Sequence, residues 1–398
     1  MNQQKNIRIA SIDILRALTM LLMIFVNDLW SLKDIPGWLE HTAAADDGMG
    51  LADTVFPAFL FITGMSIPLA VNYRRSKGDN NGQILMHILL RSVALLIMGV
   101  FLVNGEYINE AATGMKRSAW NTICCLCFIT IWNSWPEKMN KTLQNLFKIA
   151  ALVVLLFLAW IYRGGENAEQ PGYFAAHWWG ILGLIGWAYL VSAATFAFSG
   201  NRITILLMAW LLFNFLCIAS HAGWLHSVPF LKMILSPLGG GSMPALVSGG
   251  VLTTVIFLKF QGKGQNTQLI GILFICSIFL LAAGFYLRSF WGISKIRATP
   301  AWVLICSAIT IIMFIIVYWI ADLRSGASLF SVIKPAGNNT LLCYLLPYFA
   351  YAIVALSHLH LPDMVLTGGI GLLKSALFSL LIVVITGLLG RRGIRLKL

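Results

Sequence analysis

The dominant pattern along this chain is a series of long apolar runs separated by short polar segments. About 20 apolar residues, rising 1.5 Å each in a helix, span roughly 30 Å of hydrocarbon. The runs therefore predict an all-α fold, a polytopic bundle of about twelve transmembrane helices. They lie at residues 12–29, 51–72, 86–103, 118–134, 146–162, 177–198, 203–220, 244–258, 268–287, 300–320, 338–356 and 368–389.

Two of these runs give weaker signals than the others. The run 118–134 is short and contains Asn121 and Asn133, and the run 244–258 is short and rich in glycine. The polar segments between the runs are too short for a separate soluble domain. We therefore expect one transmembrane domain over residues 1–398.

The polar segments also predict an orientation. With the N-terminus inside, the inner segments hold about twice as many lysine and arginine residues as the outer ones, as the positive-inside rule requires. The basic tail RRGIRLK is the clearest anchor on the inner side. Both termini are therefore expected in the cytoplasm, which requires an even number of membrane crossings.

Composition agrees with a membrane protein and narrows its chemistry. The chain is 59% hydrophobic and 11% charged, whereas soluble domains carry about 25% charged residues. The net charge of +13 does not indicate nucleic acid, because the basic residues gather at short loops and the tail, where orientation and anionic lipid account for them. The seven cysteines lie in apolar runs, so we expect neither a disulfide framework nor a metal site.

The first apolar run carries costly polar residues at two depths. Asp13 and Arg16 are three residues apart on one helical face near its start, where they can pair. Asn27 lies roughly 21 Å further along the helix axis. Charged side chains in lipid cost several kcal/mol unless they face a bundle interior or water. The first helix is therefore expected to border a polar site.

Two further polar residues share the outer depth of Asn27. His41 lies in the loop after the first helix, and a histidine side chain can act as a general base. Asp53 opens the next helix and can orient a nearby imidazole. Each has a simpler explanation: Asn27 as a helix C-terminal residue, His41 as a solvated loop histidine, and Asp53 as a helix N-cap. Their convergence at one depth favours a site.

The inner side presents a second group of polar candidates. By the predicted orientation its basic side chains include Arg16, Arg74, Arg75, Arg91 and Lys334. Asn339 belongs to a pair of asparagines that opens the run 338–356, where capping of the helix is the alternative to contact with a polar ligand.

Several motifs together resemble the heparan-alpha-glucosaminide N-acetyltransferase family and its bacterial relatives. The similarity is densest in the first 105 residues. The matching segments are D-x-x-R (Asp13, Arg16), M-x-F-V-N (Met23 to Asn27), the loop His41, L-A-D-x-V-F-P-x-F-x-F-I-x-G-x-S (Leu51 to Ser66), LLRSVALLIMGVFLVN, ILGLIGWAYL, KIRATPAWV and GNNTLLCYL. Against that pattern, residues 118–162 resemble an inserted helix pair added to ten core helices.

The resemblance implies a membrane-embedded acyltransferase that moves an acetyl group from cytosolic acetyl-CoA to an amino sugar or related carbohydrate on the far side of the cell (inner) membrane. It implies His41 and Asn27 as the catalytic pair, with Asp53 carried over, and it makes a homodimer plausible. Cations are needed for the CoA phosphates, so we expect the cofactor near Asp13, Arg16, Arg74, Arg75, Arg91, Lys334 and Asn339.

Two other interpretations of the same residues stay open. The polar residues of a sugar or amino-sugar permease would line a transport path, although we see no clear inverted repeat in the chain. A non-catalytic membrane protein would use every polar residue as a cap or an interface anchor.

Overall fold

A computed structural model describes residues 9–136, 138–165, 172–261, 263–357 and 361–398. Within these ranges the chain is helical and forms no β-sheet, as predicted, and eleven helices are long and apolar enough to cross a membrane. The protein is therefore a multi-pass membrane protein. The eleven are α1 (Ala10–Asp28), α2 (Leu51–Ser76), α3 (Asn81–Glu106), α6 (Lys141–Ile161), α7 (Ile181–Ser199), α8 (Ile203–His221), α10 (Ser242–Gln261), α11 (Asn266–Trp291), α12 (Pro300–Tyr318), α14 (Thr340–Ser357) and α16 (Gly368–Arg391).

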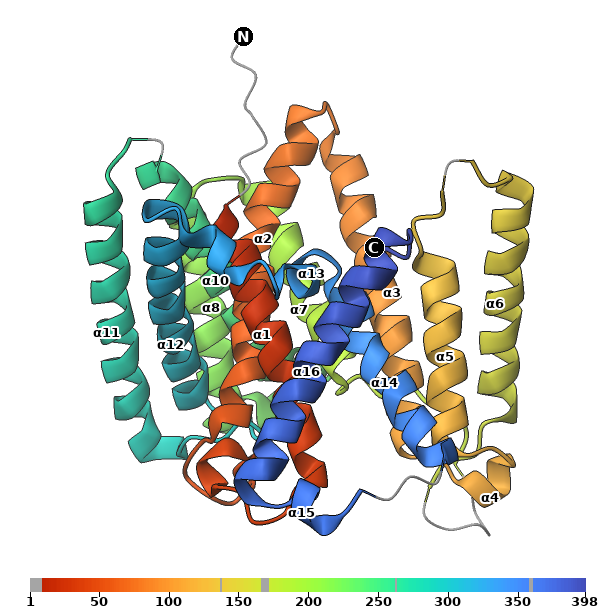
Figure 1. The fold of residues 1–398 in the computed structure, drawn as a ribbon. Coiled ribbons are helices and arrows are strands. Elements are labelled where there is room, and N and C mark those ends of the chain that lie inside the picture. Colours follow the sequence, from red (N-terminus) through yellow and green to blue (C-terminus); the bar gives the residue numbers. More distant parts are fainter. Residues whose placement is uncertain (1–8, 137, 166–171, 262, 358–360) are drawn as a thin grey trace.

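The twelfth predicted run is α5 (Arg117–Trp132), which is helical but has only 16 residues. At 1.5 Å per residue it measures about 24 Å, short of the hydrocarbon core. It nevertheless stands upright beside α3 and α6 at one edge of the bundle (Figure 1). α1 begins and α16 ends at the same end of the bundle (Figure 1), as an even number of crossings requires, and α5 would be the crossing that the eleven longer helices leave open.

Short helices connect these spans at both ends of the bundle. They are α4 (Glu110–Thr113), α9 (Pro229–Leu235), α13 (Lys334–Asn338), α15 (Asp363–Leu366), the 3₁₀ turns η1 (Leu29–Ser31), η2 (Gly37–Leu39), η3 (Trp224–Ser227), η4 (Ser236–Gly241) and η6 (Gly326–Phe330), and the π-helical turn η5 (Trp319–Leu323) that extends α12. The predicted helix 177–198 begins later than expected, at Ile181, and the predicted helix 244–258 extends to Ser242–Gln261.

Glycines bring two pairs of helices into backbone contact. A Cβ at Gly64 of α2 would overlap the carbonyl of Val247 on α10, and a Cβ at Gly250 of α10 would overlap the carbonyl of Phe61 on α2. A Cβ at Gly99 of α3 would likewise collide with the backbone of Gly183 on α7. Such close approach gains van der Waals contact, which drives helix association in lipid. The α2–α10 and α3–α7 pairs therefore form rigid units at the centre of the bundle.

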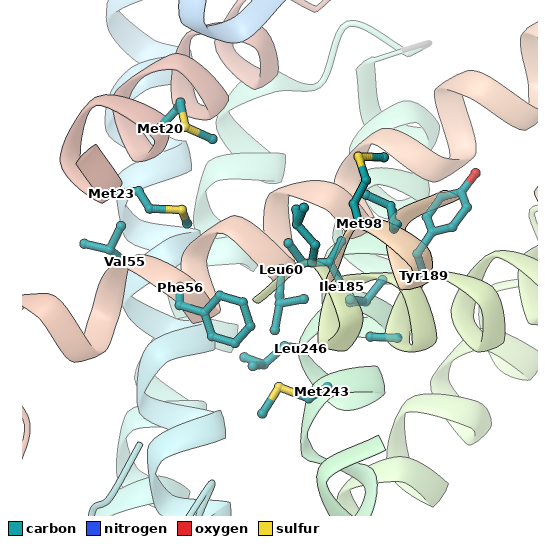
Figure 2. Packing of buried hydrophobic residues seen from close by; sticks show 14 of the residues in the cluster. Met20, Met23, Val55, Phe56, Leu60, Met98, Ile185, Tyr189, Met243 and Leu246 are labelled. Carbon is teal, nitrogen blue, oxygen red and sulfur yellow. The ribbon is translucent and has the colours of Figure 1, made fainter. Parts of the chain in front are cut away.

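The core between these pairs contains a methionine-rich apolar layer. We use the name apolar layer for Met20 and Met23 of α1, Phe56 and Leu60 of α2, and Met243 and Leu246 of α10, all buried in one packed cluster. Figure 2 shows Phe56, Leu60 and Leu246 between the α1 methionines and Met243. The α1 members of this layer, Met20 and Met23, lie between Arg16 and Asn27 along the helix.

Candidate active site

The most clearly built polar contact joins His41 to Asp53. His41 lies in the loop between α1 and α2, and its Nδ1 is 2.7 Å from Oδ1 of Asp53. Oδ2 of Asp53 accepts the backbone N–H groups of Thr42 and Gly50, each at 3.0 Å. Asp53 is wholly buried. Its carboxylate is therefore fixed by the start of α2 and by the loop at once, and it holds the imidazole in place.

The local sequence explains this arrangement. Gly50, not Asp53, is the residue that precedes α2, and Asp53 is the third residue of the helix. From there its carboxylate turns back to the N–H of Gly50, where helix starts have unpaired donors and favour negative charge. The same side chain thus stabilises the helix start and orients His41. The N-cap interpretation of Asp53 is therefore wrong in position, because Gly50 is the cap residue, although the Asp53 carboxylate does bind the helix start.

The orientation of His41 has a chemical consequence. A proton on Nδ1 donated to Asp53 leaves Nε2 as the acceptor, and the His41 side chain is 46% exposed. A neutral imidazole whose Nε2 carries no proton can take one from an amine or hydroxyl. The buried carboxylate would stabilise the imidazolium that results.

Lys295 is a third charged group at this site. It comes from the loop between α11 and α12, and its Nζ lies 3.3 Å from both ring nitrogens of His41. Burial lowers the pKa of Lys295, while the negative charge of Asp53 acts in the opposite direction. Trp302 of α12 donates its indole N–H to the backbone oxygen of Asp53 at 3.0 Å, which ties α12 to the start of α2. Opposite charges thus flank His41.

Lys295 also connects the histidine to a cavity. This outer cavity, named for the predicted orientation, has a volume of about 430 Å³. Aromatic and basic side chains line it, among them Phe56, Trp179, His221, Lys295, Arg297 and Trp302. His41 is not one of the lining residues, but it contacts Lys295, which is one.

A second cavity, the inner cavity, lies at the opposite end of α1 and has a volume of about 540 Å³. Asp13, Arg16 and Arg91 line it together with Tyr73 and Tyr189. Arg16 contacts Asp13 Oδ1 at 3.2 Å, the backbone oxygen of Gly337 at 3.3 Å and the hydroxyl of Ser66. The predicted pair of Asp13 and Arg16 is therefore present.

Arg91 is the residue of the inner cavity that is best suited to bind an anion. Its guanidinium lies over the ring of Tyr189, 4.8 Å from the ring centre. Its Nε is buried and has no hydrogen-bond partner among the residues that the structure describes. A buried donor without a partner is costly, so an anion that enters the cavity would relieve that cost.

The other predicted cofactor residues lie outside the inner cavity. Arg74 pairs with Asp79 at 2.7 Å, and Arg75 donates to the backbone oxygen of Ala197. Lys334 borders an adjoining cavity of about 210 Å³ that shares Asp13. Asn339 binds the chain near its C-terminal end, donating to Ile394 O at 2.9 Å and accepting from Leu396 N at 3.1 Å.

Asn27, the expected catalytic partner of His41, does not take part in the contact between His41 and Asp53. Asn27 lies in the last turn of α1 and is exposed. Its side chain makes no hydrogen bond with any residue in the described part of the chain. The cation in contact with His41 is Lys295, the first residue of the segment KIRATPAWV, which we had not predicted for the site.

Comparison with known proteins supports the sequence interpretation. The expected resemblance is confirmed. The chain is 34% identical over 104 residues to heparan-alpha-glucosaminide N-acetyltransferase of Homo sapiens, and 35% identical over 104 residues to the same enzyme of Mus musculus. The match covers 25% of this chain and only 14% of each relative. Residues 8–175 also match a family described as a domain of unknown function (DUF5009).

One buried charge network was not anticipated from the sequence. Asp28, next to Asn27, is buried and accepts hydrogen bonds from Lys374 at 2.6 Å, Ser375 at 2.6 Å and Tyr351 at 3.1 Å. Lys374 and Ser375 belong to α16, and Tyr351 belongs to α14. The sequence signal was available, because Asp28 and Lys374 are both charges within apolar runs. The network fixes the end of α1 that carries Asn27.

Proposed function

We propose that this protein is a membrane-bound acetyltransferase of the cell (inner) membrane. It would move an acetyl group from cytosolic acetyl-CoA to an amino sugar or a related carbohydrate on the outer side. The observation that carries the proposal is the 2.7 Å contact between His41 and the buried Asp53, with Lys295 beside the ring. The similarity to N-acetyltransferases supports the reaction class.

The chemistry assigns a role to each charged group of the site. His41 Nε2 takes the proton of the attacking amine or hydroxyl while that atom bonds to the acetyl carbon. The carbon–sulfur bond then breaks and CoA leaves as the thiolate, which takes up a proton. Alternatively, Nε2 first attacks the thioester and carries the acetyl group to the acceptor; a burst of CoA release equal to the enzyme concentration would distinguish this route. Asp53 stabilises the cationic ring in both routes.

Lys295 is the group best placed for the negative charge that develops on the thioester oxygen. Its ammonium lies within 3.3 Å of both ring nitrogens and also faces the outer cavity. One well-placed donor of this kind contributes typically about 3 kcal/mol to the transition state. Asn27, implied by the resemblance for catalysis, stays a prediction.

The inner cavity suits the nucleotide end of acetyl-CoA. Arg16 and Arg91 line it, and Lys334 borders the adjoining space. Guanidinium groups bind phosphate oxygens in paired hydrogen bonds, and Arg91 retains a buried donor for that purpose. Tyr73 and Tyr189 in the same wall offer rings for contact with adenine.

The decisive experiment uses the purified protein in proteoliposomes with acetyl-CoA and a panel of amino sugars and hydroxylic acceptors. Release of free CoA and the mass of the acetylated product are measured together. We expect transfer by the wild type, loss of transfer in His41→Ala, and retention in His87→Ala, a histidine of α3 at the other end of the bundle. Absence of CoA release with every acceptor would refute the proposal.

A permease is the second candidate, because cavities at opposite ends of the bundle would each offer a transported sugar an entry. It predicts uptake of labelled glucosamine into vesicles that contain no acetyl-CoA. Uptake that persists in His41→Ala would favour the permease over the transferase.

A further inference from the structure

The inner and outer cavities end at the same place in the bundle. The inner cavity continues into a smaller one of about 100 Å³, which shares Arg91 and Tyr189 with it and reaches Met20 and Met23. The outer cavity reaches Phe56 and Met243. These four side chains belong to the apolar layer, with Leu60 and Leu246 between them (Figure 2). One layer of side chains therefore separates the two cavities.

The proposed reaction requires something to pass this layer. The arginines suited to CoA phosphates line the inner cavity, whereas the dyad of His41 and Asp53 lies beside the outer one. The thioester end of the substrate must therefore reach between the α1 methionines and Phe56 before His41 can act on it. Water would be excluded from the closed layer, because the layer offers it no hydrogen-bond partners.

The path can open through side chains but not easily through helix movement. The backbone contacts at Gly64 and Gly250 hold α2 against α10, and the contact at Gly99 holds α3 against α7. Methionine is unbranched, with three rotatable bonds and a polarizable thioether, so it rearranges at low cost. Met20, Met23 and Met243 can therefore move aside while the helices stay in place.

We infer that the apolar layer selects the acyl group by its length. This inference rests on the proposed acetyl transfer and adds a determinant of specificity to it. The acyl group leads the thioester through the layer, so each further methylene must displace Phe56 and Met243, at the wall of the outer cavity, before the thioester carbon reaches His41. An interior packed at crystal density resists such additions.

The first test compares acetyl-CoA with butyryl-CoA in the transfer assay. One methylene in an apolar pocket changes selectivity by roughly 10–200-fold, so we expect the wild type to prefer acetyl-CoA by at least about tenfold in kcat/KM. Met243→Ala and Phe56→Ala should each raise the butyryl-to-acetyl ratio about tenfold or more.

Met98→Ala is the matched control for this comparison. Met98 is buried in the same cluster but borders none of the cavities described above, so its truncation should lower stability and leave the ratio unchanged. Equal use of both acyl-CoAs by the wild type would overturn the inference. A ratio that rises as much in Met98→Ala as in Met243→Ala would overturn it as well.

A second test does not depend on catalysis. Met23→Cys and Met243→Cys are made in a Cys276→Ser background, because Cys276 is exposed and the other six cysteines are buried. A small, charged methanethiosulfonate is applied to either side of sealed proteoliposomes. We expect each cysteine to react at least about tenfold faster from its own side. Equal rates of cysteine modification from both sides, with acetyl transfer intact, would show that the apolar layer does not separate the two cavities, and would leave the proposed function standing. Absence of all acetyl transfer would overturn the proposed function and with it the selection of acyl length.

Discussion

Asp53→Asn is the sharpest perturbation of the candidate site. Oδ2 of Asp53 accepts two backbone N–H groups at 3.0 Å, so the remaining carbonyl oxygen of Asn must stay at that position. The new amide NH₂ then points at His41 Nδ1, 2.7 Å away, and donates to it. The proton of the neutral ring moves to Nε2, and the base is lost from the atom that faces the substrate.

The expected loss follows from this change of tautomer. An equivalent replacement of a triad carboxylate by an amide lowers kcat about 10⁴-fold, which is about 5 kcal/mol at 1.36 kcal/mol per tenfold. Stability should change far less, by about 1 kcal/mol, because both backbone N–H groups keep an acceptor. Asp53→Ala would differ in this respect, since it leaves two N–H groups without their acceptor.

The assay is acetyl transfer in proteoliposomes, with thermal unfolding measured on the same samples. KM for acetyl-CoA should stay unchanged in Asp53→Asn, because Arg16 and Arg91 lie in the other cavity. Asp47→Asn is the matched control: Asp47 belongs to the same loop but binds Arg288 at 2.8 Å and Ile293 N at 2.7 Å. A kcat for Asp53→Asn within threefold of the wild type would refute the assigned role of the dyad.

Three further outcomes can be checked on the same preparation. Burial lowers the pKa of Lys295, so kcat should fall on the alkaline side at a pH below the ordinary lysine value of 10.5, where the ammonium loses its proton. Lys295→Arg should extend the plateau of the pH profile to higher pH, because arginine keeps its charge. A profile that is the same in Lys295→Arg and the wild type would remove Lys295 from the reaction. Arg91→Gln should raise KM for acetyl-CoA about tenfold or more with kcat less affected, whereas Arg74→Gln, whose arginine pairs with Asp79 outside the cavity, should not. Asp28→Asn should lower the free energy of unfolding by about 3 kcal/mol, because it leaves the ammonium of Lys374 without its charged partner. A thermal midpoint equal to that of the wild type would contradict this prediction.

Hydropathy alone determined the architecture of this protein. In lipid every backbone polar group must be satisfied within a helix, so long apolar runs have one structural outcome. The twelve runs all became helices, and even the weak run 118–134 became α5, with the shortness that its sequence showed. Motif and loop position also singled out His41 and Asp53, because a carboxylate at a helix start has a defined direction.

Contacts between distant segments were decided by the tertiary structure alone. Lys295 lies 254 residues from His41, and Lys374 lies 346 residues from Asp28, separations at which periodicity carries no information. The sequence placed Asp13 and Asn27 at two depths but did not reveal that an apolar layer closes the space between those depths. That layer depends on which faces of α1, α2 and α10 meet, and the glycine contacts between α2 and α10 set this packing.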